Sequence, residues 1–296
     1  MGYRYAKYLS VAAMLLVTGY LVLVVTSSYI FPDLKPVART HEDRSTLVFD
    51  AKIRFRKYER LPVRANVKSK KPDLILLHGF GGSLDHWDNV IPHLRQRRVF
   101  ILDMVGFGGS DHPRLRYDLD TQRRYLLGFM RNQNINKAVL AGISMGASVT
   151  AWTAAKAKKE IVGAVMIAPS AFPGSLEKEW PHNLFYRPGL LNRIAFLIVN
   201  SSIYRYLFPE NLGSQAVGVT GSYNQDFAEA LRDIDQPALL VWSRSDDTSI
   251  YRFHREYQER IKHLEFLEVS EKLGHDVVRK DPEGTAAFIN KFMKKF

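Results

Sequence analysis

Short apolar runs alternate with amphipathic stretches through most of this chain. The runs DLILL, VFIL, AVLAGI, IVGAVMI, ALLVW and LEFLEV predict buried strands. Strands that alternate with helices indicate a largely parallel sheet covered on both faces. Helical spacing of apolar residues between the runs predicts helices over 83–96, 119–133, 145–159, 249–261 and 281–296.

Two regions depart from this alternation. Residues 45–61 alternate apolar and polar positions, which predicts one or two half-buried strands. Between residues 170 and 235 the strand–helix order lapses, and an insertion of about 65 residues is too long for an ordinary loop. We therefore expect a small helical cap at about 170–235.

The expected cap contains an apolar stripe with helical spacing. One interpretation, which we favour, is that this stripe covers the core of the main domain. The other is an apolar lid for an acyl chain that also touches a bilayer. The stripe consists of Leu191, Ile194, Ala195, Ile198 and Ser202.

The amino terminus carries a long apolar segment. Residues 9–31 contain no charged side chain, and about 20 mostly apolar residues suffice for a helix that crosses a bilayer. Tyrosines stand at both ends, as interfacial aromatic residues do. We expect residues 1–31 to be a retained membrane anchor. The alternative is a cleaved signal peptide, whose apolar region is shorter, at roughly 7–15 residues.

Polar residues follow the apolar segment. Residues 32–44 contain two prolines and predict a linker to a domain over 45–296. Lys and Arg stand on both sides of the apolar segment and compete in setting its orientation. Because long domains translocate largely regardless of charge, we expect the domain on the extracytoplasmic side.

Composition and charge narrow the function classes. An apolar fraction of 46% and a charged fraction of 24% are typical of a globular protein with a sizeable core. The absence of cysteine excludes disulfides, zinc–thiolate sites and a cysteine nucleophile. Of the net charge of +12, residues 1–71 contribute +9, from 14 Lys and Arg against 5 Asp and Glu. This excess of positive charge beside an apolar segment indicates that the basic residues contact anionic lipid head groups or simply water, rather than nucleic acid.

One serine stands in a motif that suits catalysis. In AGISMGAS, residues 141–148, Gly142 and Gly146 lie two residues before and after Ser144. The pattern G-x-S-x-G between a strand and a helix is that of a nucleophile elbow, in which small residues permit a sharp turn. An ordinary strand-to-helix turn is the alternative. A serine hydroxyl also needs a nearby base, held in place by a third group.

The residues that could activate this serine follow it in the chain. Asp246 comes just after the run ALLVW, and His275 lies in a loop after the last expected strand, preceded by Gly274. The order serine, acid, histidine suits this elbow. We expect His275 to be the base and Asp246 to orient it, with Asp247 as the alternative acid.

Glycine-rich segments near the strand ends supply further candidates. The oxyanion hole is expected from the backbone N–H groups of Met145, after the serine, and Phe80, in HGFGG. We interpret His78 as a structural loop residue. The segment DMVGFGGSD (residues 103–111) lacks the spacing G-x-G-x-x-G, so we reject a dinucleotide site there.

Together these residues resemble the α/β-hydrolase superfamily. The matching motifs are HGFGGS, DMVGFGGSD, GISMG, VWSRSD and LGH, spread over residues 45–296. The resemblance implies an α/β-hydrolase fold, with a mostly parallel eight-stranded sheet, helices on both faces and a cap after the sixth strand. One N-terminal transmembrane helix would precede it. The resemblance also implies that neither a metal nor an organic cofactor is needed. Ser243 and Ala147 stand where the family often has glycine.

An anchored hydrolase with an apolar cap looks similar to membrane-bound acylglycerol lipases and related esterases. We expect a serine hydrolase that cleaves a carboxylic ester of a medium or long acyl group through an acyl-enzyme. Thioesterase, peptidase, carbon–carbon hydrolase, acyltransferase and haloperoxidase chemistry can use the same triad. A catalytically silent membrane-tethered interaction protein is the alternative of another class. The complete triad favours the enzyme.

Overall fold

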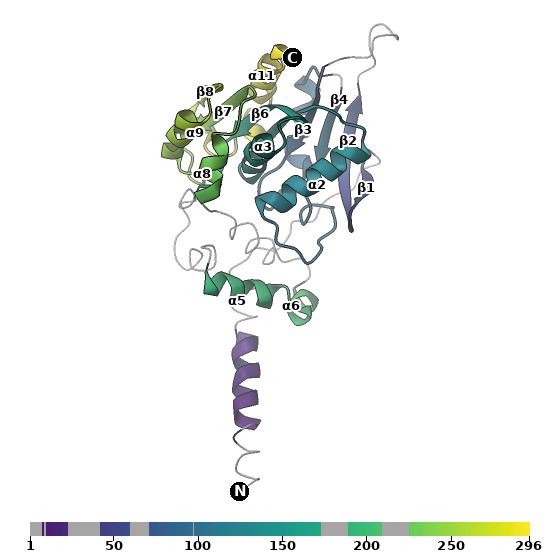
Figure 1. Cartoon of the computed structure of the whole chain (residues 1–296), viewed down its shortest axis with the longest axis vertical. Helices are drawn as coiled ribbons and strands as arrows, with labels where there is room; N and C mark the ends of the chain where they lie inside the picture. The colour runs from purple at the N-terminus through teal and green to yellow at the C-terminus, as the bar shows by residue number, and fades with distance from the viewer. Residues whose placement is uncertain are drawn as a thin grey trace.

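The fold is an eight-stranded sheet with helices on both faces (Figure 1). The computed structural model describes residues 8, 10–22, 42–59, 71–96, 98–172, 189–208 and 225–296. The strand order is β1-β2-β4-β3-β5-β6-β7-β8, and pairing is parallel from β4 to β8, while β2 is antiparallel to both β1 and β4. The strands are β1 (Arg44–Val48), β2 (Ala51–Glu59), β3 (Asp73–Leu77), β4 (Arg98–Leu102), β5 (Ala138–Ile143), β6 (Ile161–Ile167), β7 (Ala238–Ser243) and β8 (Leu264–Val269).

The strand order places the expected site at one edge of the sheet. The strands β5, β6, β7 and β8 are neighbours and run in the same direction. Their carboxyl ends therefore meet, and ligands of open α/β sheets bind at such an edge. Ser144, Asp246 and His275 follow the ends of β5, β7 and β8 in turn. The sequence predicted this α/β architecture correctly.

Two groups of helices cover the sheet. In one group α3 contacts α2 and α8, and α8 contacts α9. In the other group α11 contacts α10 and the short 3₁₀ turn η2 (Ile91–His93). Most expected helices are present within a few residues of their predicted bounds. The helices are α2 (Leu119–Asn132), α3 (Met145–Lys156), α8 (Gln225–Leu231), α9 (His254–Arg260), α10 (Val277–Lys280) and α11 (Pro282–Phe292), with short 3₁₀ turns at η3 (Tyr251–Phe253), η4 (Glu271–Leu273) and η5 (Met293–Lys295).

The prediction of a helix over residues 83–96 is wrong. This segment forms two short 3₁₀ turns, η1 (Leu84–Trp87) and η2 (Ile91–His93). Pro92 has no N–H to donate within a helix. The backbone N–H of Leu84 donates instead to the Asp103 carboxylate, 2.6 Å away. Pro92 thus lies at the start of the second turn, and the contact to Asp103 holds the first turn against the end of β4.

The expected anchor lies only partly within the described residues. Residues 10–22 form a helix, which Figure 1 shows in purple beyond the rest of the molecule. Among the residues with described structure, no helix reaches the length and hydropathy required to cross a membrane. Residues 1–7 and 23–41, which include most of the linker, fall outside the described ranges.

The cap contributes two described helices, α5 (Leu190–Val199) and α6 (Ser202–Leu207). Residues 173–188 and 209–224 lie outside the described ranges. The favoured interpretation of the apolar stripe is wrong, because Leu191 and Ile194 are exposed. Ala195 is buried in a small cluster with Val199 and Tyr204, separate from the core of the main domain. The later helix α8 does belong to that core.

Candidate active site

The serine stands on a strained turn between β5 and α3. Ser144 has φ 54° and ψ −118°, a backbone conformation that a non-glycine residue rarely adopts. Its N–H donates to the carbonyl of Ile167 at the end of β6, 2.8 Å away. The neighbouring strand thus holds the turn in place. This is the geometry of a nucleophile elbow.

Both elbow glycines are required by close backbone contacts. A Cβ on Gly142 would lie 2.2 Å from the carbonyl oxygen of Gly146. A Cβ on Gly146 would lie 2.4 Å from the carbonyl oxygen of His78. A side chain at position 142 would push the end of β5 away from the start of α3, and one at position 146 would push α3 away from the end of β3.

The predicted acid and base are directly paired. The Nδ1 atom of His275 lies 3.0 and 2.9 Å from the two carboxylate oxygens of Asp246. The Asp246 side chain is fully buried, while that of His275 is 20% exposed. The alternative acid, Asp247, is exposed, and its carboxylate accepts a hydrogen bond from the Thr248 hydroxyl. Of the two acids, Asp246 is therefore the one that faces the histidine.

The Asp246 carboxylate has further donors that the sequence analysis missed. The indole N–H of Trp242 donates to its Oδ2 over 3.0 Å. The backbone N–H groups of Thr248 and Ser249 donate to its Oδ1 over 2.9 and 2.8 Å. These bonds fix the orientation of the carboxylate toward His275. The four-residue spacing from the tryptophan to the aspartate is the only signal in the sequence for the indole contact.

Two serines connect the acid loop to the histidine loop. The hydroxyl of Ser243 donates to the carbonyl of Ser270 over 3.1 Å. The hydroxyl of Ser245 donates to the carbonyl of Glu271. Ser243, which departs from the family's usual glycine, therefore ties the end of β7 to the segment that precedes His275.

The HGFGG loop lies directly beside the serine. A Cβ on Gly79 would lie 3.3 Å from the Cβ of Ser144, which is tighter than ordinary contact, so the loop approaches the serine closely at this glycine. His78 is fully buried; its Nδ1 bonds to the Gly79 carbonyl over 2.7 Å, and its Nε2 accepts from the N–H of Met104 over 3.0 Å. Burial lowers the pKa of His78. A neutral histidine with these two bonds supports the loop.

The two proposed oxyanion donors flank the serine. Phe80 follows Gly79 in this loop, and its ring packs edge-on against Phe107. Met145 is the first residue of α3, where backbone N–H groups have no partner within the helix. Both N–H groups thus come from segments next to Ser144.

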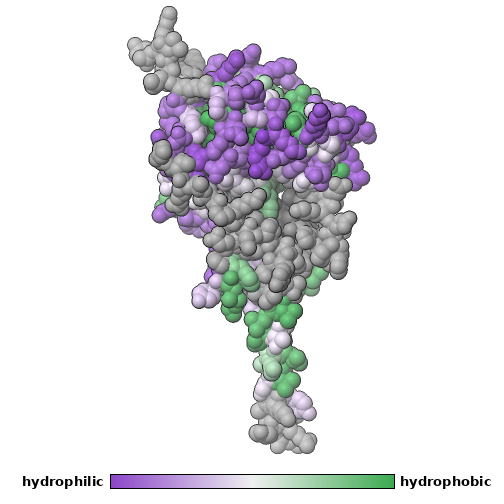
Figure 2. All heavy atoms as spheres, turned by 180° about the vertical axis from the view of Figure 1, so that it is seen from behind, coloured by the Kyte–Doolittle hydropathy of each residue, from purple (hydrophilic) through white to green (hydrophobic). Residues whose placement is uncertain are grey.

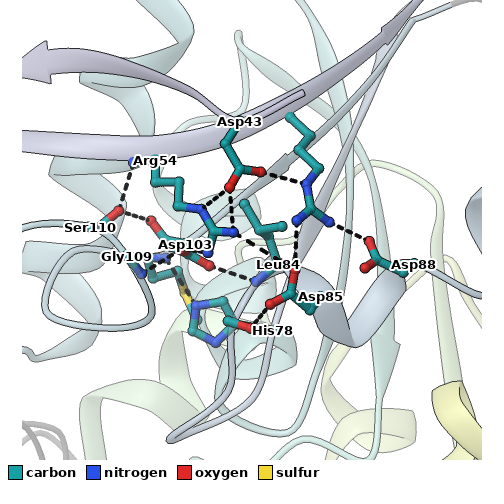
Figure 3. Close-up of polar contacts among 12 residues, drawn as sticks. Asp43, Arg54, His78, Leu84, Asp85, Asp88, Asp103, Gly109 and Ser110 are labelled. Carbon is teal, nitrogen blue, oxygen red and sulfur yellow. Dashed lines mark hydrogen bonds and ion pairs between the residues drawn. The ribbon is translucent and has the colours of Figure 1, made fainter. Parts of the chain in front are cut away.

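Behind the loops lies a buried ion-pair cluster that the sequence analysis also missed (Figure 3). Arg54, which is 3% exposed, contacts the carboxylate of Asp103 over 3.0 Å and that of Asp43 over 2.7 Å. Asp103 also accepts from the N–H groups of Leu84 and Gly109, 2.6 and 2.7 Å away. One carboxylate thus joins the two glycine-rich loops.

A second buried arginine extends this cluster. Arg56 contacts Asp43, Asp85 and Asp88 over 2.6 to 2.8 Å. Burial lowers the pKa of its guanidinium, but the hydrogen bonds that it donates to the Asp43 and Asp88 carboxylates, together with their charges, outweigh this and raise the pKa above its usual value. Arg54 and Arg56 occupy polar positions of the alternating pattern in β2, and both are buried.

One further pair connects the HGFGG side of the site to the histidine loop. The Nε2 atom of His86, in η1, lies 3.2 Å from the carboxylate of Asp276, next to His275. This hydrogen bond, with help from Arg279, lowers the pKa of Asp276 to about 2. Within the described residues, no group of three or more His, Asp or Glu side chains is arranged to hold a metal ion.

Comparison with known proteins places this geometry in a family. The model for the alpha/beta hydrolase fold matches residues 72–207, which include the HGFGG loop and the elbow. The chain belongs to the α/β-hydrolase superfamily.

Similar members of the superfamily carry several names. A dihydrolipoyllysine-residue acetyltransferase component of an acetoin cleaving system, from Pseudomonas putida, is 35% identical over 190 residues, or 58% of this chain and 51% of the relative. The pimeloyl-[acyl-carrier protein] methyl ester esterase of Shewanella woodyi is 27% identical over 202 residues, or 59% of this chain and 75% of the relative. The chain spans about half or less of the length of several such relatives.

A solved structure resembles nearly the whole chain. The crystal structure of a membrane phospholipase A, described as a bacterial virulence factor, superposes with a TM-score of 0.61 at 22% identity. The match covers 98% of this chain and 96% of that one. This likeness shows a shared α/β-hydrolase fold.

Proposed function

We propose that this protein is a serine hydrolase that cleaves carboxylic esters of lipid-like or acyl type. The observation that carries the proposal is the pair of contacts between His275 and the buried Asp246, with Ser144 on a strained elbow at the same sheet edge. A histidine held by a buried carboxylate is what a serine needs for activation.

The reaction follows from these positions. The Oγ atom of Ser144 attacks the ester carbonyl carbon while its proton passes to Nε2 of His275. The N–H groups of Met145 and Phe80 stabilise the oxyanion. His275 then protonates the leaving alcohol, and the acyl group remains on the serine. Water, deprotonated by His275, attacks the acyl-enzyme and releases the carboxylic acid, and the proton returns to Ser144.

A lipid-like substrate and a membrane attachment belong to the same proposal. Residues 9–31 are uncharged, and the described helix at 10–22 carries exposed apolar side chains such as Met14 and Leu16. We propose that this segment anchors the protein, with the hydrolase domain on the extracytoplasmic side. The membrane phospholipase A and the methyl ester esterase among the similar proteins indicate which esters to test first.

A fluorophosphonate probe tests the proposal. The wild type should be labelled, and Ser144→Ala and His275→Ala should lose labelling. Loss of the nucleophile lowers kcat by about a million-fold in a comparable triad. Ser45→Ala, at an exposed serine on β1, is the matched control and should label normally. Labelling that persists in Ser144→Ala would refute the elbow assignment, and unlabelled folded wild type would favour a silent interaction protein.

Ester hydrolysis then separates the possible chemistries. Purified protein should release acid from phospholipids and from long-chain p-nitrophenyl esters faster than from short-chain ones. A preference for thioesters or for short polar esters would contradict the proposed substrate class while leaving the triad in place.

A further inference from the structure

The helix α5 turns its apolar side chains outward. Leu190 and Leu197 are 73% and 71% exposed, while the polar Asn192 on the same helix is 2% exposed. An amphipathic helix on the surface of a globular domain shows the opposite distribution. Side chains of this kind on one surface mark an interaction site.

The next helix continues the same surface. On α6, Tyr206 is 84% exposed, and Ile203 and Leu207 are about half exposed. We define the cap platform as six exposed apolar residues of α5 and α6. They are Leu190, Leu191, Leu197, Ile203, Tyr206 and Leu207.

The cap platform adjoins the N-terminal helix. Tyr20 of that helix packs against the small cluster formed by Ala195, Val199 and Tyr204. Its hydroxyl shares a hydrogen bond with the hydroxyl of Ser201, between α5 and α6. Figure 1 shows α5 lying across the end of the N-terminal helix, and in Figure 2 the hydrophobic surfaces of the two adjoin.

The charges around the cap platform are positive. Residues 189–208 contain Arg193 and Arg205 and no acidic side chain. Arg114 reaches the Ser202 hydroxyl over 3.1 Å, and the guanidinium of Arg116 lies 4.7 Å from the ring of Phe196. Apolar side chains flanked by arginines are the composition of a helix that lies flat in a bilayer interface.

We propose that the cap platform lies in the head-group region of a lipid bilayer, beside the point where the N-terminal helix enters it. The contact between Tyr20 and Ser201 sets the angle between the two elements. Arg114, Arg116 and Arg193 face anionic head groups. The inference rests on the membrane attachment proposed above and adds that the cap itself touches the lipid from which the substrate comes.

The absence of native cysteine permits a direct test. Single-cysteine variants Leu197→Cys and Lys159→Cys of the full chain carry a polarity-sensitive fluorophore. Lys159 is an exposed residue just before β6, at the end of the sheet opposite to the cap. The labelled proteins are reconstituted in vesicles of phosphatidylcholine and phosphatidylglycerol, with and without lipids that carry a quencher. Flotation reports membrane attachment, and fluorophosphonate labelling of Ser144 reports the hydrolase function separately.

The label at Leu197 should shift to blue emission and be quenched by the lipids, while the label at Lys159 should do neither. A label at Leu197 that stays in water on floated vesicles overturns the proposal. A label that is shielded but not quenched also overturns it, because a second copy of the chain then covers the cap platform. Protein that does not float overturns both the cap platform and the anchor, whatever the probe labelling shows.

A pair of variants measures the consequence for turnover. Leu190→Ser combined with Leu197→Ser should lower the rate on vesicle-borne ester, relative to soluble ester, on the order of tenfold. Leu47→Ser, at a 62% exposed leucine on β1, is the matched control and should keep the wild-type ratio. An unchanged ratio in the double variant would overturn the proposal.

Discussion

The buried arginines behind the active site and the exposed leucines of the cap differ from each other in what surrounds them. Arg54 and Arg56 lie inside the hydrolase domain, and carboxylates of the same chain contact both. Leu190 and Leu197 lie on the surface. Burial of charge is tolerable when partners are close. Six exposed apolar side chains on two adjacent helices instead point to contact with a membrane or another apolar surface.

The two regions also differ in their distance from the reaction. The arginine cluster joins both glycine-rich loops through Asp103, so it supports the backbone beside Ser144. The cap platform lies on α5 and α6, which are inserted after β6 and contribute no residue to that cluster. We therefore expect changes in the cluster to affect folding, and changes in the cap platform to affect access to substrate.

The largest effect should follow from removing one buried charge. Arg54→Met removes the arginine that contacts Asp103 and one of the two arginines that contact Asp43. Loss of one member of a buried pair costs about 3–5 kcal/mol of unfolding free energy. Chemical denaturation measures it. Arg232→Met, which breaks a surface pair with Glu229, is the control and should cost less than about 1 kcal/mol. Equal losses of unfolding free energy in the two variants would show that the buried cluster stabilises the fold no more than a surface ion pair does.

A smaller effect should come from the pair between η1 and α10. In Asp276→Asn the bond from His86 is weakened, and we expect a loss of about 1 kcal/mol, because the Asp276 side chain is 30% exposed and solvent screens the pair. The hydrogen bond from His86 lowers the pKa of Asp276 from 3.8 to about 2. A carboxylate whose pKa is lower in the folded than in the unfolded state stabilises the folded state at pH values above the unfolded pKa.

This stabilisation has a defined pH window. It is complete above the unfolded pKa and is lost as the pH falls from there toward about 2. The difference in unfolding free energy between wild type and Asp276→Asn should therefore narrow as the solution is acidified below about pH 4. A difference that stays constant would mean that the pair does not carry the lowered pKa.

The smallest effect should be that of the cap platform on stability. Leu197→Ser should change the unfolding free energy by less than about 0.5 kcal/mol in the absence of lipid, because the side chain is already exposed. Val199 lies two residues further along the same helix but is buried in the small cluster. Val199→Ala should therefore lower the free energy of local unfolding of α5 by about 1 kcal/mol. Hydrogen exchange of the α5 amides compares the two variants. A larger loss in Leu197→Ser would place that side chain against protein rather than lipid.

Much of the site could be predicted from sequence because its signals are local. The elbow requires glycine at positions 142 and 146, since any Cβ there would clash with backbone. The order of Ser144, Asp246 and His275 in the chain, each after a strand, places them at one sheet edge once the strands are parallel. Apolar runs of buried strands are equally local, so the architecture of the sheet could also be predicted.

The remaining features depend on contacts between distant segments. Residues 83–96 have a helical pattern, yet a carboxylate from the end of β4 binds the backbone of Leu84. Arg54 and Arg56 occupy polar positions of an alternating strand and are buried because Asp43, Asp85 and Asp103 surround them. The indole of Trp242 meets Asp246 only because the intervening turn brings them together.

The sequence by itself determined which residues are apolar, where the chain must turn sharply and which side chains can carry a proton. Those properties belong to single residues and their near neighbours. Only the tertiary structure decided which polar groups are buried and which face of α5 is exposed on the surface. The periodicity of Leu191 and Ile194 defines a helical face, but the direction of that face depends on how the helix packs, and packing is a property of the whole fold.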